Sequence, residues 1–178
     1  MTTERPIIQL GNPLLRQPAQ PITSLEEASV QQLIDDLLAT VQVSNGVGIA
    51  APQVGQSLCL LIVASRPNPR YPSAPEMAPT ALINPRMLTH SDERVKGWEG
   101  CLSVPGIRGL VPRYREVEIE YLDRYGKSQR VVWTDFIARI FQHEADHLEG
   151  KVFLDRVEST ADLMTEQEYA ARVLGQSS

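Results

Sequence analysis

The feature that most constrains the fold is the run His-Glu-Ala-Asp-His at residues 143–147. The pattern of residues 136–149 predicts a helix, which Thr134 or Asp135 would start and Gly150 would end in the conformation that glycine favours. Two histidines four positions apart fall on the same helical face, where both imidazoles can bind one metal ion. The run therefore calls for a helix whose histidine face lies in the interior.

Glu144 stands next to the first histidine and could reach a water activated by the ion without being a ligand itself. The same spacing also arises by chance. The alternative is that His143 and His147 are partly buried helix residues paired with Glu144 and Asp146. The spacing alone leaves the two interpretations about equal.

Cys101 is the candidate for a third ligand, because a catalytic divalent site needs three protein ligands and one open position. The remaining histidine, His90, lies in a segment that we expect to be a polar loop. Gly100 precedes the cysteine and allows close backbone approach. A soft thiolate suits Fe²⁺, Zn²⁺, Co²⁺ or Ni²⁺ better than Mg²⁺ or Ca²⁺. The alternative is a buried structural cysteine, which is also our expectation for Cys59.

A third segment, Gly-Val-Gly-Ile-Ala-Ala-Pro-Gln at residues 46–53, has an almost bare backbone. An extended peptide could lie along it and form strand-like hydrogen bonds. Gln53 ends the segment with an amide that could donate to a developing oxyanion. The alternative is a glycine-rich turn with a solvated glutamine. The segment is not a dinucleotide fingerprint, because it follows a helix instead of opening one.

The rest of the chain predicts an α+β fold. A helix should begin at Ser24, whose side chain and that of Glu27 form a capping box, and should end at Asn45. Its apolar residues recur at helical spacing. Strands are expected at 58–63, 81–83, 117–122 and 130–133, the last two joined by a hairpin turn with Gly126, and a short helix is expected from Thr165.

These elements predict one domain over residues 1–178, with antiparallel β-sheets packed around a central metal-binding helix that carries the His-Glu-x-x-His run. Residues 66–80 contain five prolines and predict a surface loop. The net charge of −5 argues against a nucleic-acid or anionic-membrane surface. No segment has the apolar length of a membrane span, and none resembles a targeting leader. We therefore expect a cytoplasmic protein.

Taken together, the three segments resemble the peptide deformylase family. Its motifs appear in the family's order as residues 46–53, Glu-Gly-Cys-Leu-Ser at 99–103 and Gln-His-Glu-Ala-Asp-His-Leu at 142–148. The resemblance covers roughly residues 6 to 170. It implies a hydrolase that removes the formyl group from the N-terminal formylmethionine of new polypeptides.

The resemblance also implies roles for individual residues. Cys101, His143 and His147 would hold one divalent ion, Fe²⁺ in the cell, with Ni²⁺, Co²⁺ or Zn²⁺ able to replace it. Glu144 would be the general acid/base, and Gln53 with the backbone N–H of Leu102 would donate to the oxyanion. The peptide backbone would pair with Val47, Gly48 and Gly100. The methionine pocket would be lined by Glu99, Phe136, Arg139 and Ile140, although a plain core role fits Phe136 and Ile140 equally well.

Two other functions remain open at this point. A zinc endopeptidase would use His143, Glu144 and His147, but such enzymes usually take a third histidine or glutamate downstream, and no histidine follows His147. A non-catalytic binding module stabilised by metal would have a closed site and no need of Glu144. In some family members a C-terminal helix contacts the ribosome. The acidic residues Glu166 and Glu168 put that contact in doubt here.

Overall fold

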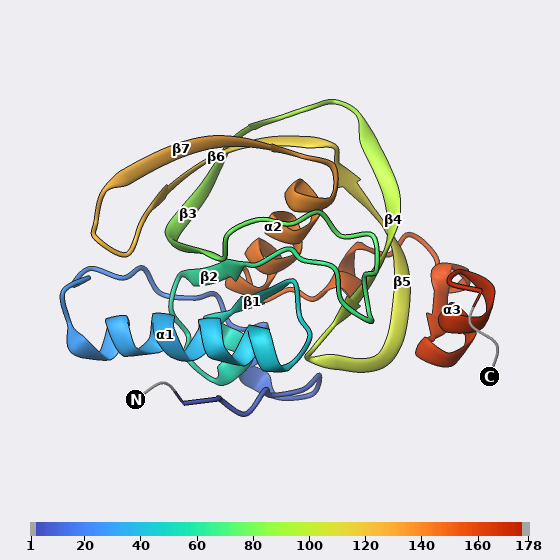
Figure 1. Cartoon of the computed structure of the whole chain (residues 1–178), viewed down its shortest axis with the longest axis horizontal. Coiled ribbons are helices and arrows are strands. Elements are labelled where there is room, and N and C mark those ends of the chain that lie inside the picture. The colour runs from blue at the N-terminus through green and yellow to red at the C-terminus, as the bar shows by residue number, and fades with distance from the viewer. Residues whose placement is uncertain (1–2, 176–178) are drawn as a thin grey trace.

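Two antiparallel sheets of unequal size organise the chain in the computed structural model, which describes residues 3–175 (Figure 1). The predicted α+β class with antiparallel strands is confirmed, since each pair of these strands is antiparallel. The five-stranded sheet has the order β1 (Gly48–Ala50), β2 (Leu60–Val63), β3 (Thr80–His90), β6 (Glu116–Leu122), β7 (Ser128–Thr134). The three-stranded sheet has the order β4 (Arg94–Cys101), β5 (Val104–Tyr114), β8 (Leu163–Thr165).

Helix α1 (Ala28–Val43) begins later than predicted. The Ser24 carbonyl accepts a hydrogen bond from the N–H of Glu27, so these residues form a turn before the helix, and the predicted capping box is wrong. The end of the helix is as expected, because Asn45 has a positive φ of 52°. The predicted apolar stripe is buried and packs against β1 and β2. Its fully or nearly fully buried members are Val30, Leu33, Ile34, Leu37 and Val41.

Helix α2 (Asp135–Leu148) lies in the middle of the molecule (Figure 1). It packs against β1, β2, β6 and β7 of the larger sheet and also against β5 of the smaller one. Thr134 is its N-cap residue, and Gly150 has a φ of 72° just beyond its end, as the sequence predicts. A Cβ atom at Gly150 would come within 2.7 Å of the Arg16 backbone, so the N-terminal arm seats against this end of the helix.

The strand predictions succeed best at the hairpin. Strands β6 and β7 pair along their whole length across a turn in which Gly126 has a φ of 80°. Strand β2 is shorter than the predicted 58–63, and β3 extends far beyond 81–83. His90 therefore ends a strand instead of lying in a polar loop, and it stacks on Tyr114.

The smaller sheet was not predicted, because no strand is expected from the sequence at the positions of β4 and β5. Both contain glycines and charged residues that disguise the alternation of a strand. Helix α3 (Glu166–Arg172) follows β8, and the Thr165 hydroxyl accepts a hydrogen bond from the N–H of Glu168, which agrees with the expected start of a helix at Thr165. Among residues 3–175, no helix is long and apolar enough to cross a membrane.

Candidate active site

Strand β4 and helix α2 bring three potential metal ligands together. Cys101 ends β4, where a register shift after Gly100 breaks the regular ladder, and His143 and His147 come from α2. Their ligand atoms all lie within 4.8 Å of one another, and Cys101 Sγ is 3.3 Å from His147 Nε2. A tetrahedral ion with ordinary metal–sulfur and metal–nitrogen bonds separates those atoms by about 3.5 Å. The three residues therefore fit one divalent ion.

The electrostatics of the cluster favour the metal-binding form of the sulfur. Burial alone would raise the pKa of Cys101, but the adjacent His147 and His143 hold the pKa of this thiol well below its ordinary value. The sulfur also accepts hydrogen bonds from Gln53 Nε2 at 3.5 Å and from the Ser103 N–H at 3.4 Å. The surroundings of Cys101 thus favour the thiolate form, unlike those of Cys59, whose pKa is raised by burial.

The carboxyl group of Glu144 faces the same cleft as Cys101 and His143. Its Oε2 is buried and makes no hydrogen bond within residues 3–175. Burial raises the pKa of Glu144 to about 7, against the opposing charges of His143 and His147. A carboxyl group with a pKa near neutrality can both accept and return a proton at physiological pH.

Gly48 makes room for this carboxyl group. A Cβ atom at position 48 would lie 2.6 Å from Glu144 Oε1 and 2.8 Å from Ile140 Cγ2, so any side chain there would clash. The glycine of β1 is therefore required by close packing against α2, since its φ is not in the left-handed region.

Gln53 is held rigidly with its amide nitrogen facing the cluster. It lies in the 3₁₀ turn Ala51–Val54, and its Oε1 accepts the N–H of Ala50 at 2.8 Å. This fixes the side chain so that Nε2 donates to Ser103 Oγ at 3.2 Å and faces the sulfur of Cys101. Only 1% of Gln53 is exposed, so the alternative of a solvated glutamine is wrong.

A cleft runs past these groups between the edges of the two sheets. It brings together every residue that the sequence analysis assigned to the peptide backbone and the oxyanion, namely Val47, Gly48, Gln53, Gly100 and Leu102. Glu99, Phe136, Arg139 and Ile140 also line it, as does Trp98. The loop 66–80 contributes Arg70 and Tyr71, as a loop covering one side of the cleft would. Nothing in the proline-rich sequence singles out these two side chains.

Glu99 does more than line the cleft, because its carboxylate holds a histidine. Its Oε2 contacts His143 Nδ1 at 2.9 Å, which leaves Nε2 of that ring to face the cysteine. Arg113 contacts the same carboxylate at 2.9 and 3.0 Å, and Arg139 at 2.8 Å. Burial works against ionisation, but Arg113 and His143 lower the pKa of Glu99 far below its usual value.

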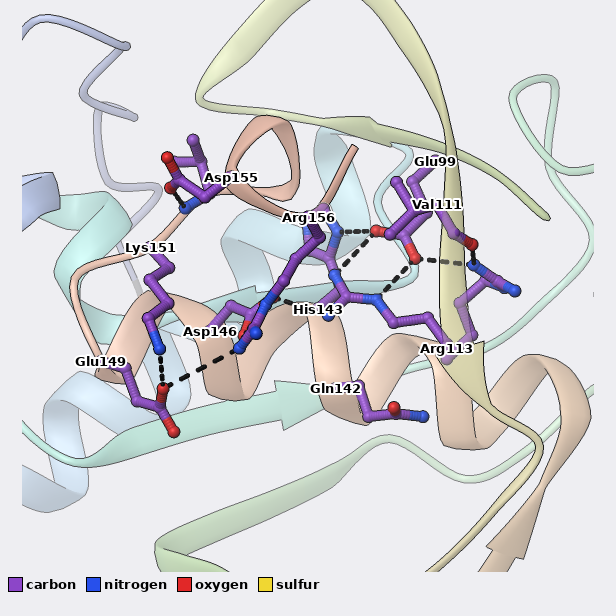
Figure 2. A network of polar contacts seen from close by, with 12 residues as sticks. Glu99, Val111, Arg113, Gln142, His143, Asp146, Glu149, Lys151, Asp155 and Arg156 are labelled. Atoms are coloured by element: carbon purple, nitrogen blue, oxygen red, sulfur yellow. Dashed lines mark hydrogen bonds and ion pairs between the residues drawn. The ribbon is translucent and has the colours of Figure 1, made fainter. Parts of the chain in front are cut away.

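Arg113 then links Glu99 to Asp146 on α2 (Figure 2). Its Nη1 donates to Asp146 Oδ2 at 2.6 Å, and Arg156 binds the same carboxylate from the other side. Asp146 is therefore not a partner of His147, whose Nδ1 has no hydrogen bond within the described residues. Sequence reasoning missed Arg113, because a lone arginine in a strand carries no local signal of burial.

Three ligands with an adjacent carboxyl group are typical of sites that use a divalent ion to activate water. Residues 4–162 match the family model described as polypeptide deformylase. The chain therefore belongs to the polypeptide deformylase family.

Relatives and solved structures agree with this assignment. The chain is 66% identical to peptide deformylase 2 of Nostoc sp. over 164 residues, which is 92% of each chain. It is 44% identical to peptide deformylase 1 of Bordetella pertussis, covering 85% of this chain and 86% of that one. A class I type b peptide deformylase from Acinetobacter baumannii, solved with Met-Ala-Ser bound, superimposes with a TM-score of 0.86 at 46% identity over 88% of this chain and all of that chain.

Proposed function

We propose that this protein removes the formyl group from the N-terminal formylmethionine of newly synthesised polypeptides, with one divalent ion held by Cys101, His143 and His147. The observation that carries the proposal is the convergence of these three ligands beside the carboxyl group of Glu144, whose Oε2 makes no hydrogen bond within residues 3–175. Family membership supports the same reaction.

The ligand set fits Fe²⁺, which we propose as the ion used in the cell, and it also suits Zn²⁺, Ni²⁺ or Co²⁺. When bound, such an ion polarises a carbonyl oxygen and lowers the pKa of a water molecule. Glu99 supports this set by fixing the ring of His143 through Nδ1.

Glu144 is the group that moves protons. It accepts a proton from the attacking water as oxygen bonds to the formyl carbon, and it delivers a proton to the methionine nitrogen as the C–N bond breaks. The products are formate and a free N-terminal amine. In the metal-free protein, burial raises the pKa of this carboxyl group to about 7.

Gln53 and the backbone N–H of Leu102 would donate to the oxygen that gains negative charge at the formyl carbon. The fixed amide of Gln53 supports this role, because a donor that is already oriented needs no reorganisation during the reaction. Leu102 follows Cys101 directly and lines the cleft, so its backbone lies next to the ligand cluster.

The substrate backbone would lie between β1 and β4, pairing with Val47, Gly48 and Gly100. The close packing of Gly48 against Glu144 and Ile140 leaves little free space beside the catalytic carboxyl group. A formyl carbon bears only hydrogen, so such a space accepts it and excludes acetyl or longer groups. Phe136 and Ile140 would contact the methionine side chain.

Arg139 has a different role, because its guanidinium group already donates to Glu99 and to the carbonyl groups of Val95, Gly97 and Val111. We propose that it shapes the pocket by holding β4 against α2. Glu99 belongs to the same support through its bonds to Arg113 and His143.

We further propose that residues 1–178 form a single domain that acts in the cytoplasm, where formylated chains emerge from the ribosome. A ribosome contact through α3 would need a surface other than Glu166, because Arg108 already binds that carboxylate with two hydrogen bonds.

The test is mass spectrometry of formyl-Met-Ala-Ser incubated with protein purified anaerobically and assayed for bound metals. We expect one divalent ion per chain and a product lighter by the mass of one carbonyl unit. Cleavage of internal peptide bonds in longer peptides would support the endopeptidase instead. A site that binds metal while Glu144→Ala keeps full activity would support the non-catalytic module.

A further inference from the structure

Tyr71 occupies part of the cleft that the proposed function assigns to the substrate. Its hydroxyl accepts the N–H of Gly100 at 3.2 Å and lies 3.4 Å from the carbonyl oxygen of the same residue, to which it donates. A single side chain therefore satisfies both backbone groups of Gly100, the residue next to Cys101.

These two backbone groups are the ones that an extended peptide would use. Strand β4 is an edge strand of its sheet, and Gly100 lines the cleft. A peptide strand added at that edge needs the free N–H and C=O of Gly100. The tyrosine hydroxyl and the peptide backbone cannot both occupy this position.

We propose that Tyr71 is a specificity-determining gate, whose hydroxyl covers the Gly100 edge in the free enzyme and is displaced by the backbone of a bound peptide. This inference rests on the proposed function. It implies that only a ligand able to replace both hydrogen bonds gains access to the edge without loss, which favours a peptide backbone over other groups of similar size.

The backbone of Tyr71 is anchored, so the movement must come from its side chain. Asn68 Oδ1 accepts the N–H groups of both Arg70 and Tyr71, at 2.9 and 3.0 Å, and closes a tight turn. The ring packs against Phe136 of α2 with 5.3 Å between centroids. Rotation about the side-chain torsions would lift the hydroxyl away from Gly100 while this turn remains intact.

Arg108 connects the gate to the C-terminal helix. Its fully buried guanidinium group lies 4.9 Å from the ring centre of Tyr71 and 4.6 Å from that of Tyr169 in α3. Glu166 of α3 binds it with hydrogen bonds of 2.8 and 2.6 Å. Loosening this ion pair should therefore free the gate, although less than removal of the hydroxyl itself.

The principal test is Tyr71→Phe, which removes the hydroxyl and keeps the ring. We expect KM for formyl-Met-Ala-Ser and Kd for the product Met-Ala-Ser to fall by about 2- to 10-fold, the effect of losing one or two competing hydrogen bonds. The matched control is Tyr125→Phe, because Tyr125 is 87% exposed and lies far from the cleft in a hairpin turn. An unchanged or higher KM and Kd in Tyr71→Phe would overturn the proposal.

Hydrogen exchange of the Gly100 amide, followed by NMR, supplies a readout that needs no turnover. Exchange in the ligand-free protein should be faster in Tyr71→Phe than in wild type, and Met-Ala-Ser should protect the amide in both. Equal exchange in the two ligand-free proteins would show that the hydroxyl does not cover Gly100. If the wild type did not deformylate the peptide but its Gly100 amide still exchanged more slowly than that of Tyr71→Phe, the proposed function would be refuted. The contact between Tyr71 and Gly100 would remain supported.

The link to α3 is tested by Glu166→Gln beside Glu168→Gln. Both residues lie on α3, Glu166 half-buried and Glu168 exposed, but Glu166 binds Arg108 whereas Glu168 pairs with Arg172. We expect Glu166→Gln to lower Kd for Met-Ala-Ser in the same direction as Tyr71→Phe and by a smaller factor. Equal behaviour of the two variants would contradict the link to the helix.

Discussion

The run 143–147 of helix α2 takes part in two buried polar regions that differ in how well their groups are satisfied. In the cleft region, Glu144 Oε2 has no partner in the described part of the chain. In the supporting region, Arg113 donates from all three of its nitrogens to Glu99 and Asp146. Buried polar groups are usually satisfied, so an exception needs an explanation. We infer from this difference in hydrogen bonding that the cleft region keeps atoms free for ligand and substrate, whereas the supporting region stabilises the fold.

The comparison predicts that changes in the cleft region reduce activity, and the largest effect should follow Cys101→Ala. Removal of the thiolate leaves two imidazoles to hold the ion, so we expect loss of stoichiometric metal and of detectable deformylation in a protein that still folds. Elemental analysis measures the metal content. Cys59→Ala is the matched control and should keep its ion, and one tightly bound ion in Cys101→Ala would show that the third ligand lies elsewhere.

Glu144→Gln should have the next largest effect. Loss of the proton carrier should lower kcat/KM by about 10²- to 10⁴-fold. Because the carboxyl group is buried with one oxygen unpaired, thermal unfolding should show no loss of stability. Glu149→Gln, at the exposed C-cap residue of the same helix, serves as the control. If Glu144→Gln were clearly destabilised, the carboxyl group would belong to the supporting region instead.

In the supporting region, Arg113→Met should act through stability. It leaves Glu99 and Asp146 buried without their shared cation, and breaking a buried pair in this way typically costs about 3–5 kcal/mol. Denaturant unfolding gives the free energy directly. Arg130→Met, at an exposed pair with Glu118, should cost no more than about 1 kcal/mol. Equal losses in the two variants would erase the contrast between a buried network and a surface pair.

The smallest effect is the dependence of folding stability on pH in the metal-free protein, and it has opposite signs in the two regions. The folded pKa of Glu144 is raised to about 7, so folding favours its protonated form, and this contribution to stability declines as pH rises from about 5 to 7. Burial alone would raise the pKa of Asp146, but Arg156 and Arg113 outweigh burial and lower it below its usual value. The contribution of Asp146 to stability is therefore present above its unfolded pKa and is lost as pH falls below about 4.

Unfolding of metal-free wild type and Glu144→Gln across this range provides the measurement. The variant should gain stability relative to wild type as pH rises from 5 to 7, by on the order of 1 kcal/mol per pH unit at most. Both proteins should lose stability alike in acid, because they share Asp146. A constant difference at all pH values would mean that the pKa of Glu144 is the same in the folded and unfolded states.

The sequence predicted α2 and the shared face of its two histidines well because these signals are local. Histidine spacing and the glycine at position 150 are read within one helix, and the hairpin turn at Gly126 is read within a few residues. The capping box at Ser24 failed because the same residue types also form turns. Arg113 and Tyr71 were missed for a different reason, since their roles depend on partners in other elements that only tertiary structure brings near, such as Asp146 at 33 residues from Arg113 and Gly100 at 29 residues from Tyr71.

The placement of the cleft between two sheet edges affects how easily these edges can pair with strands of other protein molecules. Unpaired edges ordinarily recruit further strands and begin aggregates. Here β1 and β4 border the same narrow groove, and its mouth is bordered by a loop rich in proline. A single thin strand can enter such a groove, whereas the flat side of another folded sheet cannot. The recess that admits an extended chain end thus also hinders the β1 and β4 edges from pairing with another sheet.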